Sequence, residues 1–186
     1  MLLLTSLFLA ALAGCRTGTD ARVQAATTDL TMASAGQGTN QITDADAGAI
    51  ARTINDGEIQ MAQVALQQAS SPRVREFAQL MIDHHTQANA MLQQQGFGMM
   101  KNPVTDVLNA DVNRRMNMLR GKTGMDFDRA YIGSQVDLHQ TALDTMRNTL
   151  LPSAKQEGLR TTLNNMRETV EMHLNQALQI RSQLGE

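Results

Sequence analysis

The stretch Ser71–Asn89 reads SPRVREFAQLMIDHHTQAN and decides much of the fold. Ser71 can cap a helix, and Pro72 suits the first helical position, where its missing N–H costs nothing. The apolar residues that follow recur at intervals of three and four, which predicts one buried helical face. His85 lies on that face, four residues after Met81. The stretch therefore predicts a helix that carries a histidine into the protein core.

The amino-acid composition predicts that the rest of the chain is helical as well. Only 3% of the residues are aromatic and there is no Trp, whereas Ala, Leu, Gln and Met are abundant. Straight-chain side chains lose little rotamer freedom in a helix, while β-rich folds favour aromatic and β-branched residues. The predicted fold class is therefore all-α.

Helix-start and helix-stop signals divide the chain into four long helices and one short one. The long helices are predicted over 44–70, over 72–95, over 126–150, and from the loop at 152–153 to about residue 184. A shorter helix begins at Asn102-Pro103 and ends before Gly121. The long connection between the second and third long helices allows a crossover, as in bundles of the ferritin-like kind. Residues 43–186 are therefore predicted to form a ferritin-like four-helix bundle with a short extra helix in the crossover.

Each long helix carries one metal-ligating side chain on its apolar face, and these four are Glu58, His85, His139 and His173. In an antiparallel hairpin, residues equidistant from the turn lie at the same height. The midpoint of Glu58 and His85 falls at the predicted turn, and that of His139 and His173 falls near the next one. The members of each pair are therefore expected to lie at compatible heights. His84 is rotated off the apolar face, so we expect it to be partly exposed and outside the cluster.

The four buried groups need partners, because burying a polar group without one is expensive. Three neutral imidazoles and one carboxylate suit zinc, copper(II) or iron. Polar residues one turn away could orient the second ring nitrogens of the histidines, namely Asn89, Gln135 and Thr169. The alternative is a metal-free hydrogen-bonded cluster, in which Glu58 accepts from the histidines and fixes the register of the bundle. The sequence leaves both alternatives open and does not identify the metal.

Residues 1–14 have the pattern of a bacterial secretion signal. Residues 2–13 are almost wholly apolar but too short to span a membrane as a stable helix. No Lys or Arg precedes this run, which leaves the true start codon open. The next residues, Leu12-Ala13-Gly14-Cys15, resemble the lipobox of bacterial lipoproteins. The resemblance implies cleavage before Cys15 and lipid attachment to it, and the absence of Asp at position 16 implies sorting to the outer membrane.

Residues 15–42 are rich in Thr, Ala, Gly, Ser and Asp and show no sustained periodicity. Such a segment is predicted to be a flexible tether between the lipid and the helical domain. Several acyl chains on Cys15 would hold the protein at a membrane surface without a spanning helix.

Charge and motifs narrow the classes of function. The formal charge of −2 gives no basic surface for nucleic acid, so we expect no nucleic-acid partner. The single cysteine excludes an internal disulfide framework. The chain contains no phosphate-binding loop and no nucleophilic serine or cysteine in a recognisable setting. We therefore expect a protein that is not an enzyme, and the sequence does not identify a protein partner.

Several blocks of the domain resemble, in order and spacing, a bacterial family of uncharacterised helical domains labelled as outer membrane proteins. They are Glu58-Ile59, Ser71–Val74, Phe77-Ala78, Met81-Ile82, His85–Asn89, Phe127–Ile132, Gln135-Val136, His139–Leu143, His173-Leu174 and Ala177. The resemblance covers about residues 43–184 and implies a ferritin-like four-helix fold and a location in the cell envelope. It implies no established activity. His84 is a departure, because the family usually has Asp at that position.

Together these features predict an outer-membrane lipoprotein that faces the periplasm, for which two functions remain. The first is a non-enzymatic module with a structural, stress-related or interaction role, and the second is a periplasmic metal-binding protein. The second would hold one transition-metal ion with the glutamate and three histidines of the bundle, for storage, sensing or buffering.

Overall fold

The computed structural model describes residues 41–185. The predicted signal segment 1–14, Cys15 and the predicted tether as far as residue 40 lie outside the described residues. Within the described range the secondary structure is helical and contains no strand, which confirms the all-α fold class there. No helix in this range is both long enough and apolar enough to cross a membrane.

The helices follow the predicted order. Their bounds are α2 Asp44–Gln68, α3 Pro72–Gln94, α4 Pro103–Leu119, α5 Gly124–Thr145, α6 Leu151–Ser153 and α7 Glu157–Gln183. One difference is a π-helical turn, Met146–Leu150, which joins α5 to α6 and carries the helical path past Pro152. The prediction ended this helix at Leu150. A proline inside a helix has no N–H to donate to the preceding turn. Here the wider π-helical turn precedes Pro152, and the helical path continues without a break.

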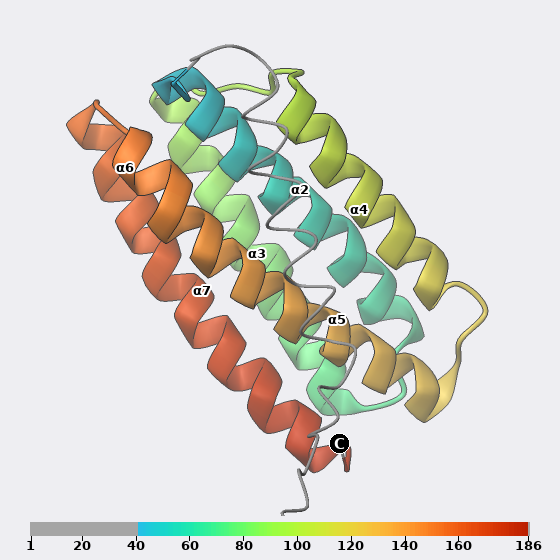
Figure 1. Cartoon of the computed structure of the whole chain (residues 1–186). Helices are drawn as coiled ribbons and strands as arrows, with labels where there is room; N and C mark the ends of the chain where they lie inside the picture. The colour runs from blue at the N-terminus through green and yellow to red at the C-terminus, as the bar shows by residue number, and fades with distance from the viewer. Residues whose placement is uncertain (1–40, 186) are drawn as a thin grey trace, which may run out of the picture.

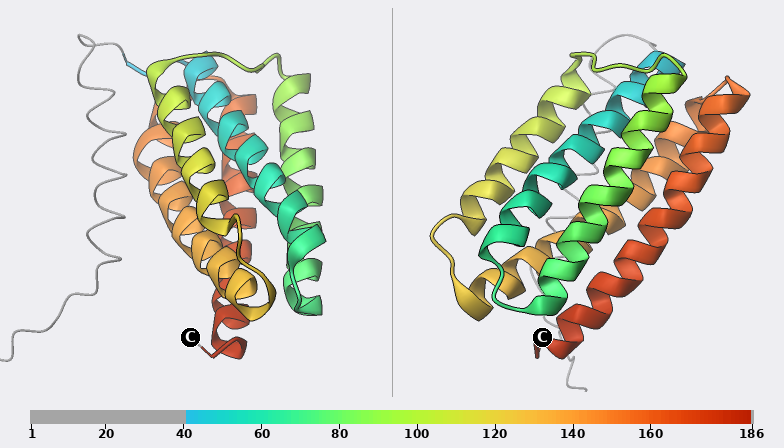
Figure 2. Two further views of the ribbon diagram at one scale, coloured as in Figure 1. Left: turned by 90° about the vertical axis from the view of Figure 1, so that its right-hand side faces the viewer. Right: turned by 180° about the vertical axis from the view of Figure 1, so that it is seen from behind.

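The long helices form two antiparallel hairpins, α2 with α3 and α5 with α7, and α3 packs against α7 (Figure 1). Helix α4 lies outside this group, against α2 and α5, and returns the chain to the opposite end of the bundle. As a result α3 and α5 run in the same direction (Figure 2). The predicted short helix in the crossover is thus present, and it runs along the bundle.

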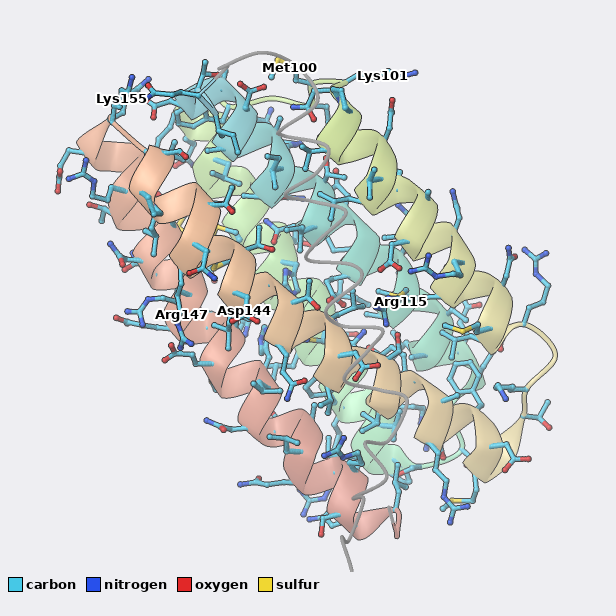
Figure 3. The ribbon with its side chains drawn as sticks, viewed as in Figure 1. Met100, Lys101, Arg115, Asp144, Arg147 and Lys155 are labelled. Carbon is cyan, nitrogen blue, oxygen red and sulfur yellow. The ribbon has the colours of Figure 1, made fainter. Side chains whose placement is uncertain are left out.

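Close packing holds α4 against the bundle. A Cβ atom added to Gly57 in α2 would collide with the side chain of Val112 in α4, so the glycine lets the two helices approach. Arg115 of α4, labelled in Figure 3, donates to the hydroxyl of Ser134 in α5 at 3.2 Å and pairs with Asp111 on its own helix. These contacts fix the crossover helix over the middle of α2 and α5.

The start of α3 is capped from another helix. Ser71 stands at the N-cap position, but its side chain makes no capping hydrogen bond, contrary to the expected role. Instead the buried carboxylate of Asp128 in α5 accepts from the backbone N–H groups of Ser70 and Ser71, at 3.0 and 2.8 Å. It also accepts from the Ser70 hydroxyl. The turn between α2 and α3 is therefore held by the second hairpin.

Replacing Asp128 with alanine should lower the free energy of unfolding by about 2–4 kcal/mol, because three part-buried hydrogen bonds to its buried carboxyl are lost. Urea unfolding monitored by circular dichroism measures the change. Asp126→Ala is the matched control, since Asp126 lies in the same turn but is exposed. Equal stability of the two variants would contradict the assigned capping role.

The core has two apolar parts with a polar layer between them. One part contains Met61, Phe77, Tyr131 and Ala177, and the other contains Ile50, Leu92, Met146 and Leu163. On the long helices, one group of buried polar residues lies near the boundary between these two parts. They are Asn55, Glu58, His85, Asn89, Gln135, His139 and His173. The bundle therefore encloses the predicted cluster at mid-length.

Candidate metal centre

Three of the predicted site residues converge in this polar layer. One ring nitrogen each from His85 in α3, His139 in α5 and His173 in α7 can be chosen so that all three lie within 4.8 Å of one another. The three side chains are buried, with exposed fractions of 5, 1 and 0%. The hairpin midpoints predicted compatible heights only within each hairpin, and the structure brings the histidines of the two hairpins together.

A hydrogen-bond chain fixes the proton position on His85. Asn55 donates its side-chain NH₂ to the side-chain oxygen of Asn89 at 2.8 Å, so its own oxygen faces His85. That oxygen lies 2.9 Å from Nδ1 of His85 and accepts from it. The proton therefore resides on Nδ1 in the neutral ring, and Nε2 carries a lone pair. Nε2 is buried and has no hydrogen-bond partner.

His139 has the same proton arrangement. Its Nδ1 lies 2.8 Å from the backbone carbonyl oxygen of Gln135, which can only accept, so Nδ1 donates. The lone pair is left on Nε2, and Nε2 lies 3.4 Å from Nδ1 of His173. This distance is long for a hydrogen bond. Two imidazole nitrogens of the cluster therefore face each other without a close bond between them.

His84 reaches the cluster through His173, although the sequence placed it outside. It is partly exposed, as expected. Its Nδ1, however, lies 2.9 Å from Nε2 of His173, and the two rings stack with centroids 5.1 Å apart. If His173 donates from Nε2 to His84, its Nδ1 lone pair faces the other two histidines. If His84 donates instead, the Nδ1 proton of His173 points at His139.

Glu58 lies beside the histidine group, on the side of His139 that carries its proton. One carboxylate oxygen of Glu58 is 3.9 Å from Nδ1 of His139, the nitrogen that donates to Gln135. Burial raises the pKa of Glu58, and the nearby His139 opposes this shift. Glu58 Oε2 and Tyr131 Oη are buried without a hydrogen-bond partner, and the nearby side chain of Gln135 also opposes the rise in the pKa of Glu58. The structure thus separates Glu58 from the nitrogens that converge.

Burial also sets the protonation of the histidines. It lowers the pKa of His173 to about 3, with further lowering from the nearby His139 and His84. Burial likewise lowers the pKa of His85 well below its ordinary value, and the neighbouring histidines add to the effect. Both rings are therefore neutral near pH 7, which is the form that binds metal ions.

Residues 27–180 match the sequence profile of a family described as a domain of unknown function, DUF4142. The chain belongs to this family. No curated protein and no solved structure matches the chain. The matched range contains α2 to α6 and most of α7, and with them the three converging histidines.

The residues predicted to orient the histidines have other roles in this DUF4142 domain. Asn89 is linked to His85 through Asn55, since it accepts from Asn55 and donates to Asp56 at 2.6 Å. Gln135 contacts His139 through its backbone carbonyl, not through its side chain. The hydroxyl of Thr169 donates to the backbone of Asn165, and His84 takes the position at His173 that Thr169 was expected to fill.

Two residues that contact the histidines directly were missed from the sequence. Asn55 lies three residues before Glu58, so both belong to one face of α2, and this spacing could have revealed it. His84 was missed because a single buried face was assumed for α3. In the DUF4142 bundle α3 packs against both α2 and α7, and the second contact covers His84 in part.

A pocket of about 130 Å³ lies between α3 and α7 and borders the cluster. Its lining residues are Asn55, His84, His85, Gln87, Ala88, Met91, Asn165, Met166, Thr169, Val170 and His173. Gln87 and Asn165 are exposed, so the pocket reaches the surface of the domain there. The pocket therefore extends from the surface to residues of the buried cluster, His85 and His173 among them.

Proposed function

We propose that this domain binds one transition-metal ion through Nε2 of His85, Nε2 of His139 and Nδ1 of His173. The observation that carries the proposal is the lone pair on Nε2 of His85, which is buried without a partner in a ring whose centroid lies 6.2 Å from that of His139 and 5.4 Å from that of His173. A buried acceptor without a donor costs about 1–3 kcal/mol. A metal ion would supply the missing partner.

The spacing of the nitrogens supports the same proposal. With zinc–nitrogen bonds of about 2.0–2.1 Å, two ligands of a tetrahedral ion lie about 3.3 Å apart. The 3.4 Å between Nε2 of His139 and Nδ1 of His173 fits this value, whereas it is long for a hydrogen bond. A small movement of the His85 ring would complete a three-nitrogen site.

The outer contacts also have the form that metal-binding histidines require. Such histidines donate the N–H of their second ring nitrogen to an oxygen or another acceptor. This bond fixes the orientation of the ring and the position of its proton. Here His85 donates to Asn55, His139 donates to the Gln135 carbonyl, and His173 can donate to His84. A metal-free hydrogen-bonded cluster explains the contacts of His139 and His173, but it leaves His85 Nε2 without a partner.

Three neutral imidazoles suit zinc or copper(II), and iron less well without a carboxylate ligand. Glu58 was the expected carboxylate ligand. In this proposal it stands behind His139 and acts on the electrostatics of that ring. The function is then the binding of an ion for storage, sensing or buffering, and not catalysis.

Metal analysis of the full chain with Cys15→Ser, made without a histidine tag, tests the proposal. After loading with zinc and dialysis, we expect one equivalent of zinc in this protein and less than about a tenth in His85→Ala, because two nitrogens hold the ion far more weakly. Thr169→Ala is the matched control, since Thr169 lines the same pocket. Substoichiometric metal in the unsubstituted site, or equal metal in His85→Ala, would remove the proposal.

The wider setting is also a proposal. The helix α4, which makes α3 and α5 run in the same direction, supports a ferritin-like arrangement. The segment Leu12-Ala13-Gly14-Cys15 after an apolar run supports a lipoprotein of the outer membrane that faces the periplasm. Labelling of cells with a radioactive fatty acid tests the anchor, and we expect label on the natural chain and none on Cys15→Ser.

A further inference from the structure

We infer that the ion held by the three histidines keeps an exchangeable fourth position, which opens on the pocket between α3 and α7 and accepts a small anion. The inference rests on the proposed metal site. It goes further in naming a second ligand and the path by which that ligand arrives.

The protein supplies three ligands where a tetrahedral ion takes four. Within the described part of the chain, the group of converging ligand atoms contains three histidines and no carboxylate or thiolate. Glu58 lies toward the Nδ1 side of His139, and Nδ1 of His84 is engaged by His173. Among the described His, Cys, Asp and Glu residues, none other is therefore placed with these three to supply the fourth ligand.

The pocket is the route to this position. His85 and His173 both line it, and His139 does not. The unpartnered Nε2 of His85 belongs to a residue that is 95% buried, so an ion at this nitrogen would lie at the inner end of the pocket. A ligand that enters at Gln87 and Asn165 would meet the ion between α3 and α7.

Charge selects an anion. Three neutral imidazoles carry no negative charge, so only the Glu58 carboxyl behind His139 could offset part of the charge of a divalent ion inside the bundle. The described residues that line the pocket include no Asp, Glu, Lys or Arg. A buried charge without a counter-charge is costly, so a negative ligand is favoured at the open position. Side-chain amides and hydroxyls in the lining, at Gln87, Asn165 and Thr169, can donate to it.

Size limits the anion to a few atoms. The pocket has a volume of about 130 Å³. Pockets for drug-sized ligands begin at about 300 Å³. The position therefore suits hydroxide or a small inorganic anion, and azide is an appropriate probe.

Cobalt(II) substitution tests the inference, because the visible spectrum of cobalt(II) responds to its ligands. The Cys15→Ser chain is loaded with one equivalent of cobalt and titrated with azide. We expect a saturable change of the visible bands with one azide per cobalt. In Asn165→Phe, which places a ring at the mouth of the pocket, we expect unchanged cobalt binding and at least tenfold weaker azide binding. Asn164→Phe is the matched control and should bind azide as the unsubstituted site does.

Each outcome separates the two proposals. No cobalt binding in any protein would remove the metal site itself. Cobalt binding with a spectrum that saturating azide does not alter would overturn the open position and leave the metal site standing. The same result, together with a sulfur-to-cobalt charge-transfer band that is lost in Met166→Leu, would show that a thioether fills the position. Equal azide affinity in Asn165→Phe and Asn164→Phe would overturn the route through the pocket.

Discussion

Saturating zinc is expected to raise the thermal unfolding midpoint of the Cys15→Ser protein strongly. At a free zinc concentration 1,000 times Kd, binding to the native state alone adds about 4 kcal/mol of stability. For a chain of this size each kcal/mol corresponds to about 2–4 °C, so the shift should be about 8–16 °C. Differential scanning calorimetry with and without zinc measures it, with a chelator in the metal-free sample.

The shift should disappear when a proposed ligand is removed. In His139→Ala one of the three nitrogens is lost, and we expect a shift of less than about 2 °C at the same zinc concentration. Asp126 is exposed and distant from the cluster, so Asp126→Ala should keep the whole shift of the unfolding midpoint. An equal shift in His139→Ala would show that zinc stabilises the protein at some other place.

Without metal, the protein should lose stability as the pH falls from about 6.5 toward 3. Burial lowers the pKa of His173 to about 3 and that of His85 well below its ordinary value. Below pH 6.5 the unfolded chain therefore takes up protons that the native histidines refuse. The free energy of unfolding then falls by up to about 1.4 kcal/mol per pH unit for each such histidine.

The titration of Glu58 opposes this loss of stability at low pH, and a substitution can remove its contribution from the measurement. Burial raises its pKa, so above pH 4.5 the native carboxyl keeps a proton that the unfolded chain releases, and its contribution falls as the pH rises. Glu58→Gln removes this term, and urea unfolding of that variant between pH 3.5 and 7.5, with chelator, follows the histidines with less opposition, although burial also raises the pKa of Asp137. A free energy of unfolding that is constant between pH 6.5 and 4 in Glu58→Gln would contradict the prediction.

The sequence predicted the helices and the matching heights within each hairpin because both depend on local rules. Apolar spacing and the positions of Pro72 and Gly96 defined the elements, and equal distances from a turn defined the heights. These rules say nothing about which helices lie next to each other. The contact of α3 with α7, which brings His85 to His173, comes from the docking of the two hairpins.

The sequence could not predict how each helix is rotated about its own axis. One residue along a helix turns by 100°, so a broad buried face can contain side chains that point to different neighbours. Glu58 and Asn55 share one face of α2, yet Asn55 contacts His85 while Glu58 lies nearest His139. Only the packed arrangement of α2 between α3 and α5 distinguishes them.

The three converging nitrogens come from two hairpins that are separated along the chain by α4. During folding, a chain with only the α5–α7 hairpin formed would offer His139 and His173, and a chain with only the α2–α3 hairpin would offer His85 alone. Tight binding would therefore begin only after the hairpins dock, as a late event in folding. By the same argument, any local opening that separates α3 from α7 would release the ion, so its dissociation rate would report how often the native bundle opens.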